Sequence, residues 1–143
     1  MTRSATSRPF SLRSCAVLLV SLSWCALTGC GPKIVPVSGT ATLDGKSLEG
    51  FLVTFTPDAD KGHEGRMDCS GRIGADGRYS LRMDDGFKQY KGVPPGWYKV
   101  TISSPDDKPL PVHQKYTSIK TTPLAIEVVA DPQPGAYDLK FTR

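Results

Sequence analysis

The sequence predicts an all-β fold for residues 35–143, a single antiparallel β-sandwich of seven short strands. Apolar side chains recur at every second position in seven segments, which is the pattern of half-buried strands. Turn dipeptides such as Asp44-Gly45 and Asp76-Gly77 separate several of these segments. No segment after residue 30 shows the helical period, and short strands between frequent turns are typical of a sandwich.

Short turns are expected between most of the seven strands. The strands cover residues 35–43, 51–56, 66–73, 78–83, 97–103, 124–128 and 137–141. The clearest alternation lies in 97–103, where Tyr98, Val100 and Ile102 share one face. In the strand at 78–83, alternation directs Tyr79, Leu81 and Met83 toward the core and Arg78 and Arg82 away from it.

The first 29 residues have the layout of a secretory signal. Arg3, Arg8 and Arg13 precede a largely apolar run at 15–27, and small residues follow it. A basic region, a short apolar region and a small-residue cleavage site are typical of exported proteins. The apolar run is shorter than the roughly 20 residues that cross a membrane as a helix. We therefore expect residues 1–29 to be a signal peptide, helical before its removal.

The end of this segment, Leu27-Thr28-Gly29-Cys30, resembles the lipobox of bacterial lipoproteins. The resemblance implies that Cys30 is acylated, with palmitate among the fatty acids expected, and becomes the first residue of the mature chain. Residues 30–34 would then be the lipidated cysteine and a short tether, with the domain at 35–143 outside the cytoplasm in the cell envelope. Inner and outer membrane both remain open. The alternatives are an uncleaved signal anchor and an ordinary signal peptide with a chance cysteine.

Loss of residues 1–29 changes the charge and the cysteine count. Fifteen of the 18 Lys and Arg residues and all 14 Asp and Glu residues remain, so the net charge falls from +4 to +1. That balance lacks the clustered positive charge of a nucleic-acid-binding protein. Cys15 and Cys25 leave with the signal, so Cys69 has no disulfide partner within the chain. We expect Cys69 to be a small buried apolar residue, with a reactive thiol or an intermolecular bridge as the alternative.

Four segments, in the same order, resemble motifs of carboxypeptidase-regulatory-like domains. They lie at residues 37–50, 75–81, 94–102 and 115–124 and include Asp44-Gly45, Asp76-Gly77 and Pro94-Pro95-Gly96. Ser47 stands where the first motif usually has proline, and Gly74 where the second usually has an acid. The resemblance implies a transthyretin-like or immunoglobulin-like sandwich that is exported and usually not catalytic.

Few residues offer chemistry for catalysis. The two histidines, His63 and His113, are fifty residues apart in expected loops and lack the local spacing of a zinc site. No histidine neighbours Cys69 in the sequence, so we expect no enzyme, no cofactor and no metal site. One alternative stays open, a periplasmic module that binds a metal or a small molecule. It would use the acid pairs Asp84-Asp85 and Asp106-Asp107, or His63, His113 and Cys69.

The expected binding surface lies in the loop at 84–96 and at the start of the following strand. Phe87, Tyr90 and the outward-facing Trp97 interleave there with Lys88 and Lys91. Exposed aromatic side chains stack on sugar rings or dock on partner proteins. The alternative is that these aromatic rings fold back over the edge of the sandwich. The sequence thus predicts a membrane-anchored envelope lipoprotein whose non-catalytic β-sandwich makes structural, protein or glycan contacts.

Overall fold

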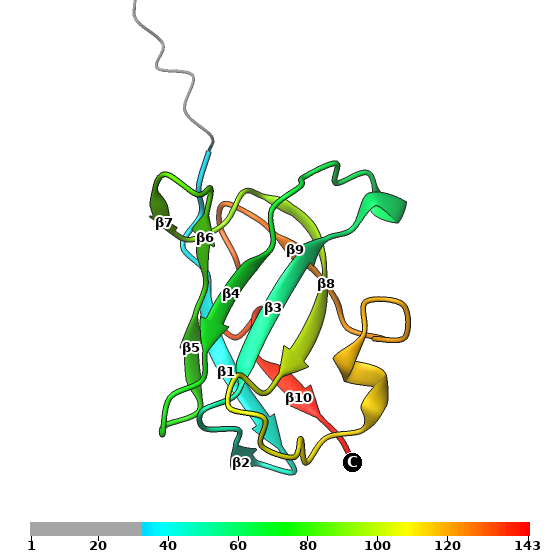
Figure 1. The fold of residues 1–143 in the computed structure, drawn as a ribbon. Coiled ribbons are helices and arrows are strands. Elements are labelled where there is room, and N and C mark those ends of the chain that lie inside the picture. The colour runs from blue at the N-terminus through cyan, green and yellow to red at the C-terminus, as the bar shows by residue number, and fades with distance from the viewer. Residues whose placement is uncertain (1–32) are drawn as a thin grey trace, which may run out of the picture. The chain divides into compact units, whose positions relative to one another are not determined.

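The structure, a computed structural model, describes residues 33–143, which form two β-sheets (Figure 1). The expected signal helix and Cys30 lie outside the described residues. The prediction of an all-β fold is confirmed. The strands are β1 (Ser38–Leu43), β2 (Lys46–Ser47), β3 (Leu52–Pro57), β4 (Cys69–Arg72), β5 (Arg78–Ser80), β6 (Arg82–Asp84), β7 (Gln89–Lys91), β8 (Gly96–Ser103), β9 (Ala125–Val128) and β10 (Leu139–Phe141). Two short 3-10 helices, η1 (Ala59–Lys61) and η2 (Gln114–Thr117), complete the elements. In residues 33–143 no helix has the length and apolar character needed to cross a membrane.

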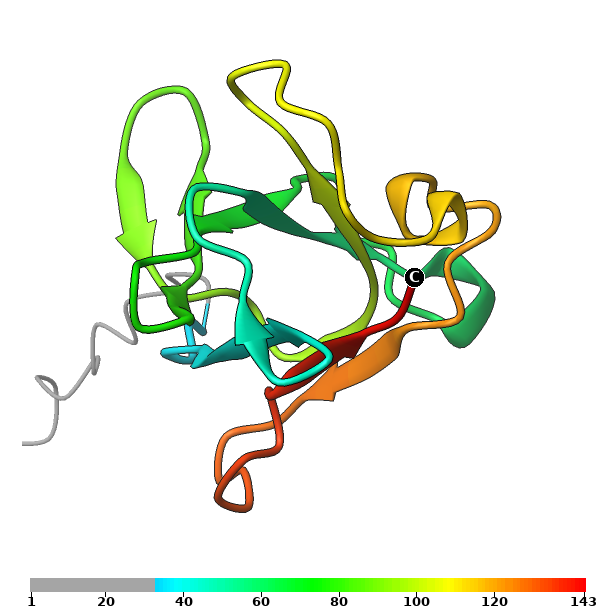
Figure 2. The same ribbon diagram turned by 90° about the horizontal axis from the view of Figure 1, so that it is seen from below.

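The two sheets face each other across the core. One sheet has the strand order β10-β1-β2, with β5 also paired to β1, and the other has the order β7-β6-β4-β3-β8-β9. In Figure 2, β1 (cyan) and β10 (red) lie on one side of the interior, while β3 and β4 (green) lie on the other. The alternating apolar residues of both sheets point into this interior, which is the packing that the sequence pattern predicts.

Most of the residues predicted to face inward are buried, and Phe51, Leu124 and Ile126 are half-buried and pack against the core. In the strands expected at 35–43, 78–83, 97–103 and 137–141, the inward residues are Val35, Val37, Ala41, Leu43, Tyr79, Leu81, Met83, Tyr98, Val100, Ile102, Tyr137, Leu139 and Phe141, and all of them belong to the core. Cys69 is also fully buried, as predicted. The Tyr79 hydroxyl donates to the Tyr137 carbonyl oxygen at 2.6 Å, so this buried hydroxyl has a partner beside β1.

The strand count and one pairing differ from the prediction. The described residues hold ten strands rather than seven, because β2 and β7 are additional and the strand expected at 78–83 divides into β5 and β6. The expectation of a wholly antiparallel fold is wrong at β1 and β10, which are parallel. Asp138, which directly precedes β10, holds β10 beside β1. Its Oδ1 accepts hydrogen bonds from the Thr40 backbone N at 2.8 Å and the Thr40 hydroxyl at 2.9 Å. Alternation within each strand carries no information on strand direction, so the sequence could not reveal this pair.

The segment at 78–84 passes from one sheet to the other. Its first part, β5, pairs with β1, and its second part, β6, pairs with β4. At the transition the Leu81 backbone N donates to the Val37 carbonyl oxygen at 2.9 Å. Gly71 of β4 lies so close to this segment that a Cβ there would overlap the Ser80 carbonyl group. The crossing therefore needs a glycine in β4. The crossing also brings the outward residues of β4, β5 and β6 to one side of the fold.

Candidate functional site

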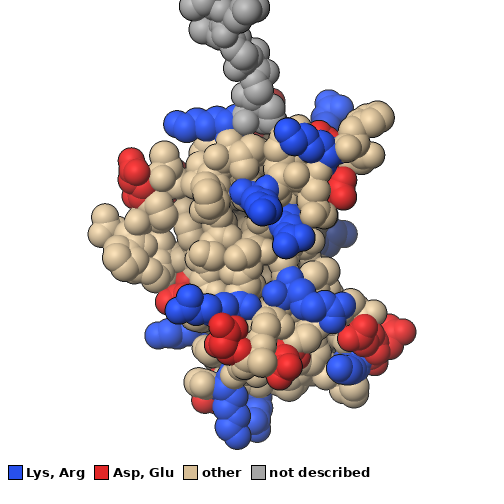
Figure 3. Space-filling model, turned by 90° about the vertical axis from the view of Figure 1, so that its left-hand side faces the viewer, with Lys and Arg blue, Asp and Glu red and all other residues tan. Residues whose placement is uncertain are grey.

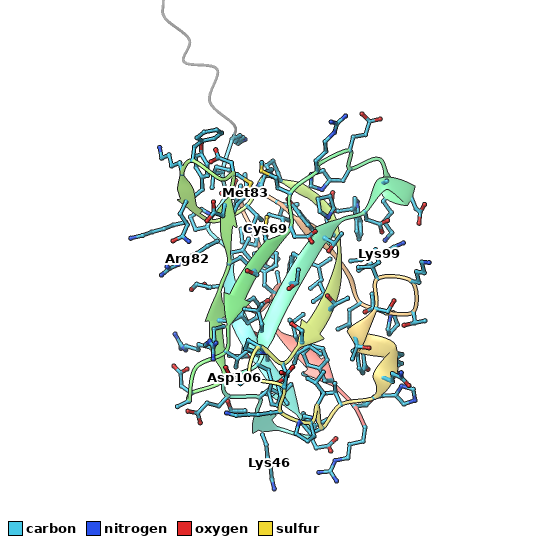
Figure 4. All side chains as sticks on the ribbon, viewed as in Figure 1. Lys46, Cys69, Arg82, Met83, Lys99 and Asp106 are labelled. Atoms are coloured by element: carbon cyan, nitrogen blue, oxygen red, sulfur yellow. The ribbon has the colours of Figure 1, made fainter. Side chains whose placement is uncertain are left out.

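A hollow of about 680 Å³ lies on the outer face of β4, β5 and β6. Strand alternation explains its lining, because the even-numbered residues of these strands face outward while Cys69, Tyr79 and Met83 face the core. Figure 4 shows Arg82 and Met83 on opposite sides of β6. The polar side chains that define the hollow are Ser70, Arg72, Arg78, Ser80, Arg82 and Gln89. We call this group the arginine hollow.

The register between β4 and β6 brings two arginines of the hollow onto one face. Ser70 pairs with Arg82 across the two strands. Arg72 follows Ser70 by two residues on β4, so it lies on the same face. Arg78 belongs to β5, on the other side of the crossing, and its side chain also lines the hollow. All three arginines thus extend from strands and not from a loop.

The guanidinium groups retain free donors. Arg82 donates to the Gln89 side-chain oxygen at 3.3 Å, and Arg72 donates to the Gly50 carbonyl oxygen at 3.3 Å. The ion pairs of Arg72 with Asp106 (3.5 Å) and of Arg78 with Asp76 (3.9 Å) are solvent-exposed, and such pairs contribute little. Each arginine has five N–H donors, so an anionic ligand would not have to break a strong internal bond.

Charge at the hollow is mixed. Asp68 and Asp84 also contribute to the lining, against three arginines, and Asp106 and Asp76 pair with Arg72 and Arg78. The carboxylate of Asp84 is engaged within its own turn, where Oδ1 accepts from the Gly86 backbone N at 2.8 Å. Lys91 pairs with Arg82 across β6 and β7 and adds a cation beside the hollow. Figure 3, which faces the side of β5, β6 and β7, shows Lys and Arg side chains across the middle of this surface.

Four of the five residues predicted as a binding surface lie together on the β6–β7 hairpin. The loop expected at 84–96 contains β7, so Phe87 and Lys88 occupy the hairpin turn while Tyr90 and Lys91 belong to a strand. Phe87 is 101% exposed. Tyr90 is half-buried and packs against the core, and Lys88 Nζ lies 5.1 Å from the centre of its ring. Phe87 is thus the apolar group that this hairpin presents to its surroundings.

Trp97 does not join this group. It lies on β8, and β6, β4 and β3 stand between β8 and β7 in the sheet. Its half-buried ring is covered by Lys61 of η1, whose Nζ lies 3.6 Å from the ring centre. The structure therefore separates the two aromatic sites that the sequence placed on one surface.

Polar groups beside Trp97 hold the loop after β3 onto β8. Lys99 Nζ lies 2.8 Å from Asp60 Oδ2 and 3.5 Å from Oδ1 of Asp58, a residue that is 97% buried because only 3% of it is exposed. The hydrogen bond to Asp60 raises the pKa of Lys99, and the same bond lowers the pKa of Asp60. His63 Nδ1 lies 2.9 Å from the Trp97 carbonyl oxygen. These contacts hold the loop after β3 against β8, so the cluster has a structural role.

The remaining titratable groups singled out in the sequence also have local structural roles. His113 Nδ1 accepts from the Lys115 backbone N at 3.1 Å, where it caps η2. Burial raises the pKa of the Cys69 thiol to about 11, with a smaller contribution from Asp68. Within residues 33–143 no three His, Cys, Asp or Glu side chains converge as metal ligands would.

Comparisons of the whole chain with protein-family models, curated proteins and solved structures gave no match. The candidate site, the arginine hollow, is therefore identified from the geometry of the described residues. Sequence alternation already directed Arg78 and Arg82 outward, but Arg72 joins them only through the register of β4, which a sequence pattern does not determine.

Proposed function

We propose that this protein is a lipid-anchored envelope protein whose non-catalytic β-domain binds an anionic group in the arginine hollow. The observation that carries the proposal is the convergence of Arg72, Arg78 and Arg82 on one outer face around a hollow. A planar guanidinium binds carboxylate or phosphate through two parallel hydrogen bonds, so three of them on rigid strands favour such a ligand. The envelope offers these groups on acidic glycans and on proteins.

The proposed anchor agrees with where the folded domain begins. The backbone groups of Val35 and Val93 exchange hydrogen bonds of 2.8 and 2.9 Å, and the preceding residue, Ile34, packs against the core. Cys30 precedes Val35 by five residues, which span at most about 17 Å when extended. A lipid on Cys30 would hold the domain close to the membrane surface, where contacts to envelope components are accessible.

We also propose that the domain is a carboxypeptidase-regulatory-like sandwich of the transthyretin-like or immunoglobulin-like kind. Each of the seven predicted strands has a counterpart, with β2 and β7 as additions. The resembling motifs fall at turns that need their residues: Asp44 and Gly45 have φ values of 51° and 78°, and Gly77 has a φ of 78°. No observation on the described part of the chain favours the alternative of a metal-binding module.

Binding of defined anions tests the hollow. The purified lipidated protein should bind a short oligouronate, oligoglutamate or inorganic phosphate, and a neutral oligosaccharide of the same length serves as the control probe. The first two probes distinguish a glycan source from a protein source of the carboxylate. A triple variant, Arg72→Gln with Arg78→Gln and Arg82→Gln, should lose this binding.

A matched variant separates a site from general charge. Lys46, Lys120 and Lys140 are exposed and do not line the hollow, so their replacement by Gln removes the same charge elsewhere. Equal loss of binding in the two triple variants would contradict a specific site. Mass spectrometry of the mature chain tests the anchor separately, since it should show an acylated Cys30 at the amino terminus.

A further inference from the structure

The β6–β7 hairpin presents an apolar ring on a rigid turn. Asp85 Oδ1 accepts hydrogen bonds from the backbone N of Phe87 at 2.9 Å and of Lys88, at 2.6 Å. These two bonds lower the pKa of Asp85, so the carboxylate stays ionised and keeps the turn in place. Gly86 supplies the positive φ of 85° that the turn requires. The full exposure of Phe87 is therefore built into the turn.

Full exposure of this ring in water is unfavourable. Burying a phenylalanine side chain is favourable, and Phe87 realises none of that gain in the domain by itself. The other exposed large apolar residues, Met67, Ile119 and Val129, keep only 37–45% of their surface in solvent. Phe87 thus differs from the ordinary apolar surface of this domain.

The composition around the ring matches a membrane surface. Lys88 and Lys91 are exposed on the same hairpin, and the exposed Lys33 lies just before the Val35–Val93 contact. An aromatic ring flanked by lysines is typical of segments that insert into the headgroup region, where lysines are attracted to anionic lipid. Asp84 and Asp85 of the same turn accept backbone N–H groups and remain charged, so the three lysines leave one net positive charge at this end of the domain.

The hairpin also lies at the end where the chain enters the domain. Figure 1 shows β6 and β7 beside the start of the described chain. Val93, two residues after β7, holds Val35, and Phe87 is six residues from Val93, a distance of at most about 20 Å. A lipid on Cys30 would therefore bring this hairpin within reach of the same membrane leaflet.

We propose that the tip of the β6–β7 hairpin is a membrane-contact site, in which Phe87 enters the headgroup region and Lys88 and Lys91 face anionic lipids. The inference rests on the proposed anchor at Cys30. Insertion of the hairpin tip, together with the lipid on Cys30, would fix the orientation of the domain relative to the membrane. It would so determine which way the arginine hollow faces.

Fluorescence quenching by brominated lipids tests this contact. The variant Phe87→Trp is reconstituted through its native lipid into vesicles containing anionic phospholipid, with Ile119→Trp as the matched control. Ile119 is partly exposed and follows η2, away from the hairpin in sequence and in sheet position. The tryptophan at 87 should shift its emission to the blue and lose intensity with brominated lipid, beyond the background of the unmodified protein. The tryptophan at 119 should do neither.

Failure of the anchor and failure of the contact can be told apart. If mass spectrometry shows no acyl group on Cys30, the chain is coupled through the Cys30 thiol to a maleimide lipid after Cys15→Ser and Cys25→Ser, since Cys69 is buried. Quenching at position 87 in that sample would support the hairpin contact although the native anchor is absent. Equal quenching at 87 and 119, in either sample, would overturn the membrane-contact site.

Discussion

The two faces of the segment at 78–84 differ in nearly every physical property. Tyr79, Leu81 and Met83 point inward and are at most 2% exposed, whereas Arg78 and Arg82 point outward and are exposed. The inner face joins the two sheets, and the outer face forms the arginine hollow. Because inward and outward residues alternate along this segment of two short strands, folding and the proposed binding can be changed separately by neighbouring substitutions.

The largest effect is expected from the inner face at Leu81. Leu81→Ala removes a side chain that is 2% exposed at the crossing between the sheets, and such substitutions cost about 2–5 kcal/mol. Denaturant unfolding measures the loss. The neighbouring outward substitution Ser80→Ala should change the free energy of unfolding by less than about 0.5 kcal/mol. Similar losses in both variants would contradict the division into two faces.

A smaller loss is expected where the inner face carries a hydroxyl. Tyr79→Phe leaves the buried Tyr137 carbonyl oxygen without its 2.6 Å partner, which costs about 1–3 kcal/mol. Tyr90→Phe on the hairpin is the control, because Tyr90 is only half-buried, and its stability should stay within about 0.5 kcal/mol of the parent protein. Unfolding curves that coincide for Tyr79→Phe and the parent protein would show that this bond does not stabilise the fold.

Cys69, paired with Met83 on the inner side, gives a pH dependence. Burial raises the pKa of its thiol from 9.0 to about 11, so between these values the folded chain retains a proton that the unfolded chain has lost. Stability should therefore be unaffected below pH 9 and should fall by up to about 2 kcal/mol as the pH rises from 9 to 11. The measurement is the difference in unfolding free energy between the parent protein and Cys69→Ala across this range. A difference that does not change with pH would argue against a buried thiol.

The smallest effect on stability is expected from the outer face. Arg78→Gln and Arg82→Gln should each change the free energy of unfolding by less than about 0.5 kcal/mol, because both side chains are exposed. Each should nevertheless weaken binding of the oligouronate probe, and added salt should weaken the binding of the parent protein because it screens exposed charges. Calorimetric titration at two salt concentrations measures both effects. Binding that resists both salt and substitution would place the ligand elsewhere.

The inner face was predictable from the sequence, and the outer face was predictable only in part. Alternation identified Tyr79, Leu81 and Met83 as core residues because burial leaves a period-two pattern. The hollow also depends on which residues of β4 lie opposite β6, and this register arises from backbone pairing that leaves no such pattern. For the same reason proximity in sequence grouped Trp97 with Phe87, although three strands separate β8 from β7. The parallel pairing of β1 with β10 depends on long-range contacts such as that of Thr40 with Asp138.

Backbone amide chemical shifts show directly whether the arginine hollow is the binding site. The lipidated protein in detergent micelles is titrated with the oligouronate probe and followed by two-dimensional NMR. Binding in the arginine hollow should concentrate the shift changes at Ser70, Arg72, Ser80 and Arg82, with little change at Lys61 and Trp97. Changes centred on Lys61 and Trp97, or no saturable change at all, would contradict the assignment of the arginine hollow as the binding site.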